Sequence, residues 1–190
     1  MVMLTETDGL TIFLRASADG DVGALTMMME VGGRELLMLT RKDGMSCAYM
    51  ASENGHAEAL RILIEAGGNA LLMLTDTDGV SCACIASLCG HVEALEVLLE
   101  AGGRELLMLT RNDGMSCAHM ASANGHAEAL RILIEVGGDE LLMLTDTDSV
   151  SFANMELLMI TGNDGTSCAW VASQNGHVEA LGMLIEAGGI

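Results

Sequence analysis

The fold of this chain is decided by residues 43–68, which read DGMSCAYMASENGHAEALRILIEAGG. The turn Asp43-Gly44 precedes Ser46, a residue type that caps helix N-termini, so a first short helix is expected after it. Gly55 supplies the left-handed residue that commonly ends a helix. Apolar residues then recur at helical spacing up to the closing Gly-Gly, which predicts a second helix. Helices this short are marginal alone in water, so the pair must bury its apolar faces against neighbouring units.

Copies of this segment fill nearly the whole chain. Units that begin at residues 34, 69 and 104 follow one another with a period of 35 residues. Self-similarity at that scale is typical of a solenoid. We therefore predict one repeat domain over 1–190, whose units are a cap-like 1–33, then 34–68, 69–103, 104–138, a truncated 139–154, and 155–190.

In the order of its features the chain resembles ankyrin-repeat proteins. The unit begins with a turn glycine at Gly44 and a helix-start motif at 46–49, followed by the paired small residues Ala51-Ser52. A Gly-His step at Gly55-His56 and a Leu-rich second helix at 60–68 complete it. Cysteine stands where the family has proline, at Cys47, Cys82, Cys117 and Cys168. The family period is about 33 residues, so each unit here carries two more, in the hairpin segment between units. The resemblance implies an all-α ankyrin-repeat solenoid of stacked antiparallel helix pairs joined by hairpin loops.

The chain is strongly acidic, with a formal net charge of −19. Nucleic acid is therefore not expected as a partner, because phosphate binding needs a basic patch. We also expect no membrane association, because the apolar runs are too short to cross a bilayer and no signal peptide is evident. The acidic surface either keeps the array solvated or steers a basic partner protein toward it, and both interpretations stay open.

The cysteines and the recurring histidines are interpreted as structural. Four of the six cysteines repeat one position; stacked helices lie about 8–10 Å apart, whereas a disulfide needs Cα atoms within about 7 Å. We therefore expect reduced, buried thiols, which fit a cytoplasmic location. A histidine follows the helix-ending glycine in each full unit, without an acidic or Cys partner fixed beside it, so no catalytic, metal or cofactor site is expected. These histidines are His56, His91, His126 and His177.

The truncated unit at 139–154 lacks the Gly-His step and the second helix. We favour a structure in which 139–154 loops out and the last unit docks on 104–138. The alternative is an irregular helix over 151–160, since Phe152, Met155 and Leu158 recur at helical spacing. In both cases the join at 139–163 is expected to be the weakest interface, because solenoid stability depends on contacts between neighbours.

The resemblance implies a binding surface, formed in ankyrin-like arrays by hairpin tips and exposed positions of the first helices. Among these positions Leu88 and Cys89 make an apolar spot, which either anchors a partner side chain or abuts the next repeat. By position in this sequence, the surface residues are Lys42, Met45, Glu53, Asn54, Thr77, Val80, Leu88, Cys89, Asn112, Met115, Ala123, Asn124, Asn163, Thr166, Gln174 and Asn175.

We therefore expect a monomeric, non-catalytic scaffold or adaptor that binds another protein on its concave face. The alternative is a structural or effector array segment of a larger protein whose activity lies in another domain. An enzyme is the rival class, and nothing beyond generic His and Cys residues supports it.

Overall fold

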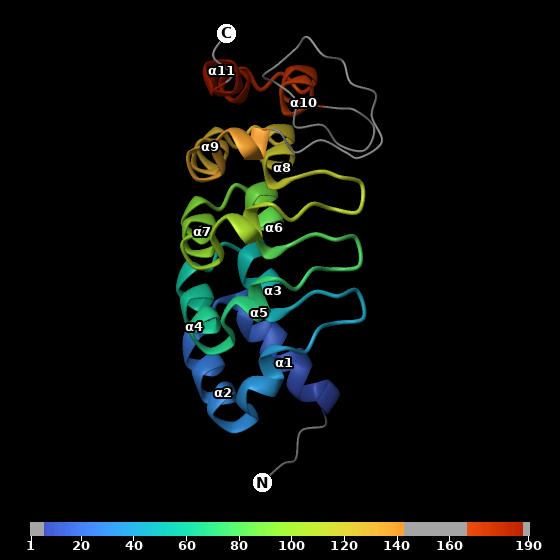
Figure 1. Cartoon of the computed structure of the whole chain (residues 1–190). Coiled ribbons are helices and arrows are strands. Elements are labelled where there is room, and N and C mark those ends of the chain that lie inside the picture. Colours follow the sequence, from blue (N-terminus) through green and yellow to red (C-terminus); the bar gives the residue numbers. More distant parts are fainter. Residues whose placement is uncertain (1–5, 143–166, 188–190) are drawn as a thin grey trace.

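The computed structural model describes residues 6–142 and 167–187, and its helices stack in two layers (Figure 1). The inner layer lies beside the hairpins and holds α1 (Glu6–Asp19), α3 (Cys47–Glu53), α6 (Cys82–Cys89), α8 (Cys117–Ala123) and α10 (Cys168–Gln174). The outer layer holds α2 (Val22–Leu37), α4 (Ala57–Gly67), α7 (Val92–Leu107), α9 (Ala127–Leu142) and α11 (Val178–Ala187). Each helix contacts the next of its own layer, and the predicted all-α solenoid is confirmed.

Local signals in the sequence set the ends of the inner helices. Ser46 Oγ accepts a hydrogen bond from the Tyr49 N–H at 3.1 Å, so this serine caps α3 as predicted. Ser81 caps α6 in the same way at 3.2 Å. Gly55 follows α3 with φ of +73°, the left-handed conformation that glycine adopts without steric cost.

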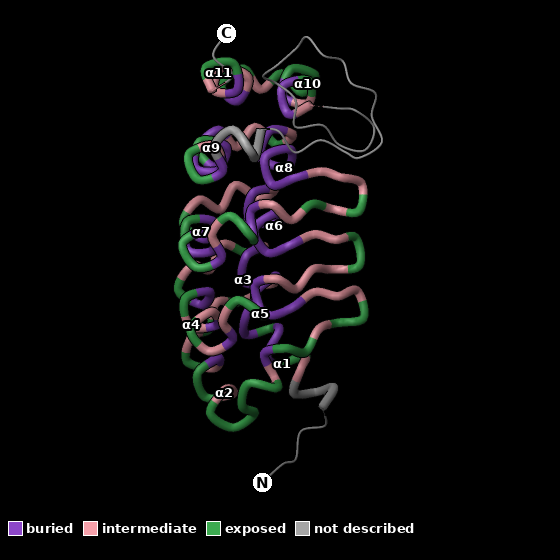
Figure 2. The backbone as a smooth tube through the Cα atoms, viewed as in Figure 1, coloured by how far each residue is buried: buried purple, intermediate pink, exposed green. Residues whose placement is uncertain are grey.

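The core is thin and is made of small inner helices against Leu-rich outer helices. Alanine and cysteine fill the inner helices, and Cys47, Ala48 and Ala51 are fully buried in α3. The outer helix α4 adds Leu60 and Leu63, which are also fully buried. Among the described residues, burial follows the contact between the two layers (Figure 2). Burying a leucine contributes about 1.5–3 kcal/mol, so the repeated pairs supply most of the stability.

A turn of helix follows the closing Gly-Gly of each of the first four units, where the sequence had predicted only hairpin. It forms α5 (Asn69–Leu72) after α4, and elsewhere it continues an outer helix across a kink at Gly33 or Gly103. These glycines have positive φ, +65° and +55°, which breaks the helix axis there. The turn buries leucines at the inner-layer boundary, which explains why it is helical; they are Leu37, Leu71, Leu72, Leu106 and Leu107.

Two of the cysteines at the family's proline position, Cys47 and Cys82, anchor this extra turn. The Cys47 thiol donates to the Leu37 carbonyl at 3.6 Å, and the Cys82 thiol donates to the Leu72 carbonyl at 3.5 Å. Proline could not make this bond. Cysteine and the longer connection therefore occur together for a structural reason.

The last helix pair stacks on the pair before it: α10 contacts α8, and α11 contacts α9. Across this interface the Asn175 amide donates to the Ala123 carbonyl at 2.9 Å. The docking that we predicted for the last unit is thus confirmed. Residues 139–142, which we expected to loop out with the rest of the truncated unit, form the end of α9. Residues 143–154 and the alternative helix over 151–160 lie outside the described residues.

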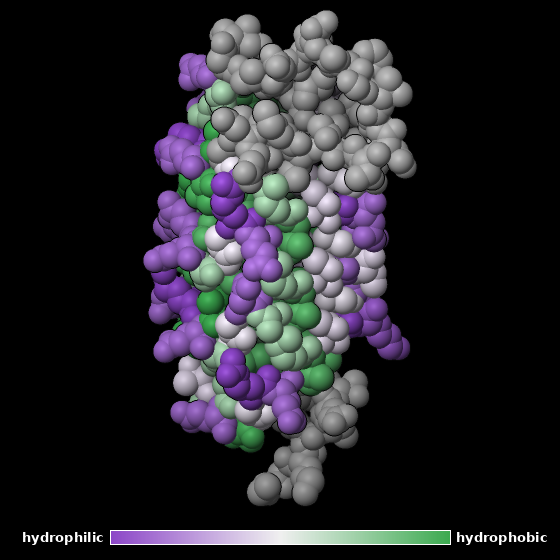
Figure 3. Space-filling model, viewed as in Figure 1, coloured by the Kyte–Doolittle hydropathy of each residue, from purple (hydrophilic) through white to green (hydrophobic). Residues whose placement is uncertain are grey.

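Hydropathy separates the faces of the array. Hydrophilic side chains gather over the outer helices, and apolar side chains form a band beside the hairpins (Figure 3). Met38 and Leu39, which follow α2, remain 41% and 40% exposed. None of the described helices combines the length and the apolarity needed to cross a membrane.

Candidate functional site: the inner-helix and hairpin face

Histidines tie each inner helix to the next repeat. His91 Nε2–H donates to the Glu53 carbonyl at 3.0 Å, and His126 Nε2–H donates to the Leu88 carbonyl at 3.0 Å. His56 and His177 make the same bond to Ala18 and Ala123, at 2.8 Å and 3.1 Å. The structural role predicted for these histidines is confirmed. The carbonyls that they engage lie at the C-terminal ends of the inner helices, beside the predicted binding positions.

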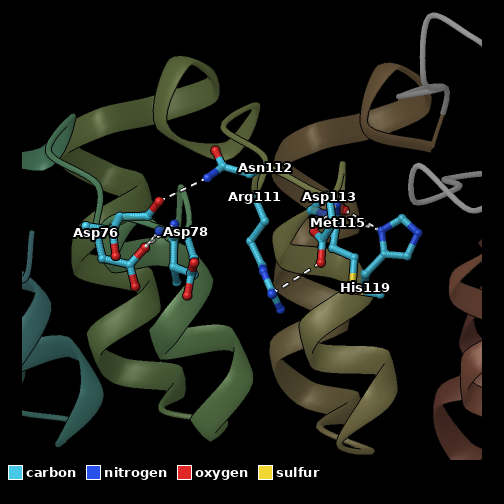
Figure 4. Close-up of polar contacts among 10 residues, drawn as sticks. Asp76, Asp78, Arg111, Asn112, Asp113, Met115 and His119 are labelled. Atoms are coloured by element: carbon cyan, nitrogen blue, oxygen red, sulfur yellow. Dashed lines mark hydrogen bonds and ion pairs between the residues drawn. The ribbon is translucent and has the colours of Figure 1, made fainter. Parts of the chain in front are cut away.

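The hairpin tips are joined into a ladder of backbone hydrogen bonds. The Thr77 N–H donates to the Asp43 carbonyl at 2.9 Å, and the Asn112 N–H donates to the Asp78 carbonyl at the same distance. The Asn112 amide adds a bond to the Thr77 carbonyl at 3.0 Å (Figure 4). These bonds hold successive tips in register, so that the tips form a continuous edge.

Aspartate carboxylates accept hydrogen bonds or form ion pairs within the hairpins. Asp76 Oδ1 accepts from the N–H groups of Asp78 and Val80, at 2.9 Å and 2.8 Å. Arg111 pairs with Asp113 at 3.2 Å within the next hairpin (Figure 4). The acidic residues of the tips are therefore engaged in the turns. Among the described residues, no group of three or more His, Cys, Asp or Glu could hold a metal ion.

A groove opens at the N-terminal end of this face, with a volume of about 980 Å³. Its walls are α1, the start of the first hairpin and α3. Its apolar lining side chains are Leu10, Leu14, Ala18, Leu39 and Met50. Polar and charged side chains complete the lining, namely Thr11, Arg15, Asp19, Thr40, Arg41, Lys42, Asp43, Glu53 and Asn54.

Two of the cations on the rim are already paired. Arg15 pairs with Asp19 at 2.7 Å, and Arg41 pairs with Asp43 at 2.8 Å. The four side chains are between 37% and 76% exposed, so these pairs contribute little to stability and can exchange partners. The groove thus presents an apolar floor with a rim of mixed charge.

One family model, described as ankyrin repeats (3 copies), matches residues 12–108. The stacked helix pairs, the glycine-histidine contacts and the hairpins in register agree with this match. The chain belongs to the ankyrin-repeat family. Ankyrin repeats are generally protein–protein interaction modules and are generally not catalytic. A comparison with curated proteins returned no match.

The ankyrin surface positions expected from the sequence are spread along the array. Only Lys42, Glu53 and Asn54 line the groove. Exposed positions farther along are Thr77 and Asn112 at hairpin tips, with Asn124, Gln174 and Asn175 at inner-helix ends. Half-buried positions are Met45, Val80, Leu88, Cys89, Met115 and Ala123. Asn163 and Thr166 lie outside the described residues.

The contribution of α1 to the groove was missed from the sequence. The first ankyrin unit departs from the repeat pattern, so it was interpreted as a cap. Leu10, Leu14 and Ala18 nevertheless recur at helical spacing and all line the groove. That spacing was the available signal.

The expectation that the cysteines are free thiols is confirmed, and the expectation of burial is confirmed for five of them. All six are free, and five of them are buried, whereas Cys89 is half-buried. The argument from the spacing of helix layers concerned the four cysteines at the repeated position and did not address Cys84, which lies at another position. In the structure Cys84 Sγ lies 3.0 Å from Cys117 Sγ, because Cys84 occupies a different helix position and faces the next ankyrin repeat.

Proposed function

We propose that this ankyrin-repeat protein is a non-catalytic scaffold that binds a segment of a partner protein along the inner-helix and hairpin face. The observation that carries the proposal is the groove between α1, the first hairpin and α3. Its apolar floor and charged rim resemble the anatomy of protein interfaces, in which a desolvated centre is surrounded by polar groups.

The floor is accessible enough to bury apolar side chains of a partner. Leu39 is 40% exposed, and Leu10 and Met50 are half-buried. Methionine adapts its shape to different ligands, which suits a surface that accepts a peptide side chain. A volume of about 980 Å³ lies at the upper end of the range of about 300–1,000 Å³ for ligand sites, which favours an extended segment.

Long-range charge favours a basic partner. A net charge of −19 creates a field that accelerates the approach of a cation-rich surface. On arrival, Glu53 on the groove wall and the paired Asp19 and Asp43 are available to basic side chains. Association should therefore slow as salt is raised, since screening shortens the reach of the field.

We propose in addition that the protein acts as a monomer in the cytoplasm. Five free thiols are buried in the repeats, which fits folding in a reducing compartment.

A matched pair of variants tests the groove. Asn54 and Asn124 occupy the same position of two nearly identical repeats, both are exposed, and each amide donates to a helix carbonyl at 2.9 Å. Only Asn54 lies in the groove. We expect Asn54→Arg to weaken partner binding by about tenfold, and Asn124→Arg to weaken it less, because Asn124 lies on the same face but outside the groove.

The partner is first captured with the intact array and identified by mass spectrometry, and its affinity is then measured by calorimetry. Circular dichroism checks that both variants keep the helicity of the parent. Equal affinities for the parent and Asn54→Arg would refute the groove as the contact site.

A further inference from the structure

Two buried thiols meet at the interface between the third and fourth helix pairs. Cys84 comes from α6 and Cys117 from α8, 33 residues apart in sequence, with their Sγ atoms 3.0 Å apart. Neither side chain is exposed to solvent. A disulfide bond is about 2.0 Å long, so the two sulfurs need to approach by only about 1 Å.

This pair occurs at one repeat interface among those described. Each full unit has cysteine at the family's proline position, and the residue two positions later differs from unit to unit: Tyr49, Cys84, His119 and Trp170. The equivalent pair one interface earlier is Tyr49 and Cys82. Only α6 carries a second cysteine at the variable position, and it meets the cysteine of the next unit.

The contacts of these sulfurs differ from those of the anchoring thiols. Cys47 and Cys82 donate to the backbone carbonyls of Leu37 and Leu72. Cys84 and Cys117 contact each other, and Cys84 has a longer contact of 3.8 Å to the Leu109 carbonyl. The second pair is therefore placed for sulfur–sulfur chemistry in addition to packing.

The surroundings make Cys84 the more acidic of the two. The hydrogen bond from Cys117 lowers the pKa of Cys84, and Ser81 and the Arg111 guanidinium act in the same direction against the effect of burial. The same bond, together with burial, raises the pKa of Cys117 well above its ordinary value. Because the thiolate is the reactive form, we take Cys84 as the attacking sulfur and Cys117 as the resolving thiol; the same disulfide forms if the roles are exchanged.

We propose that Cys84 and Cys117 are an oxidation site, where hydrogen peroxide converts the two thiols into a disulfide that links the third and fourth repeats. Peroxide is small enough to enter during local opening of the interface, whereas bulky oxidants are excluded by the burial. The inference goes beyond partner binding and does not depend on the groove.

The reaction balances in two steps. Cys84 sulfur attacks one oxygen of peroxide, the O–O bond breaks, and water leaves with the thiol proton, so that Cys84 becomes a sulfenic acid. Cys117 sulfur then attacks Cys84 sulfur, the S–O bond breaks, and a second water leaves with the Cys117 proton. Two thiols lose two electrons and two protons, and one peroxide is reduced to two waters.

The disulfide would restrict the unfolded chain and hold α6 against α8. Cross-links over loops of this size stabilise proteins, and for a chain of this length we expect the thermal midpoint to rise by about 5 °C or more. The link would also restrain Leu88 and Cys89, which lie at the end of the same helix.

The intact, reduced protein is treated with hydrogen peroxide at a temperature where it stays folded, and remaining thiols are alkylated in denaturant. Peptide mapping by mass spectrometry should show one predominant cross-link, Cys84 to Cys117. The thermal midpoint of unfolding should rise on oxidation and return to its original value after reduction. Cys84→Ser and Cys117→Ser should each abolish the cross-link, while Cys89→Ser, which alters a half-buried thiol of the same helix, should retain it.

The decisive result comes from the unaltered chain, so a variant that folds poorly does not decide the outcome. If both thiols of the oxidised parent remain available for alkylation, or if cross-links are distributed among Cys82, Cys89 and other cysteines, the proposal is overturned.

Discussion

Single residues at fixed positions join the repeats. At each join a histidine of one repeat packs against the helix-ending glycine of the repeat before it. A Cβ atom at Gly90 would lie 2.4 Å from His126 Nδ1, so a side chain there would displace the ring from the Leu88 carbonyl. The same fit recurs at Gly55, where a Cβ would lie 2.7 Å from His91 Nδ1. Glycine is thus required at these positions for two reasons: its backbone has a positive φ, and a side chain would occupy the space that the histidine ring fills.

Buried thiols make the stability of the array depend on pH. Burial raises the pKa of Cys47, Cys82 and Cys168 to about 12, whereas an unfolded cysteine ionises near about 8.5. Between these values the unfolded chain releases protons that the folded chain keeps, so the free energy of unfolding falls as pH rises from about 8.5 to 12. Each thiol should contribute a slope of about 1.4 kcal/mol per pH unit.

Urea unfolding of the reduced protein at several pH values in that window measures the slope. The Cys82→Ala substitution should reduce the pH dependence of the free energy of unfolding by about the contribution of one thiol. This holds whether or not the substitution changes stability at neutral pH. Cys89→Ala is the matched control, because Cys89 is half-buried and loses less hydration on folding. An unchanged slope for Cys82→Ala would contradict the assignment.

At the scale of elements, the inner helices α3, α6 and α8 differ at their C-terminal ends as well as at the variable third position. The ends of α3 and α8 carry an exposed asparagine, Asn54 and Asn124, whose amide bonds to the helix. The end of α6 carries Leu88 and Cys89 instead, and both are half-buried. This end therefore presents partly accessible apolar atoms where its neighbours present amides.

We predict that Leu88 and Cys89 contribute to partner binding. Replacing them with the Glu-Asn pair found at the end of α3 should weaken binding by about tenfold, because an apolar anchor is lost while the helix end keeps a native pattern. Helicity by circular dichroism should be unchanged. The affinity for the captured partner is measured by calorimetry, and a value equal to that of the parent would show that these residues only abut the next repeat.

At the scale of the whole molecule, each helix pair is stabilised by its neighbours, and the last pair has fewer of those contacts. Trp170 is 52% exposed, whereas Tyr49 at the same repeat position is 5% exposed and His119 is fully buried. The pair is held to the previous repeat by bonds from Asn175 and His177 to one carbonyl, that of Ala123. In an array of nearest-neighbour units, the end with the weaker interface opens first.

Hydrogen exchange should therefore be fastest in the last pair. Amides of α10 and α11 should exchange at least about tenfold faster than those of α3 and α4, which lie within the array. Mass spectrometry of proteolytic peptides from the native, reduced protein resolves the two regions. Equal protection of residues 168–187 and 47–67 would show that the junction before α10 is as stable as the regular interfaces.

What the sequence determined by itself was the local and periodic part of the structure. Serine caps, left-handed glycines and apolar spacing act within one repeat, and the period shows that neighbouring repeats must bury those faces; the family follows from this pattern. The tertiary structure alone decided what meets across repeats. It placed α1 opposite α3 to form the groove, turned the residues after Gly-Gly into helix, and brought Cys84 to Cys117. These contacts depend on the direction of side chains between layers, which spacing along the chain does not specify.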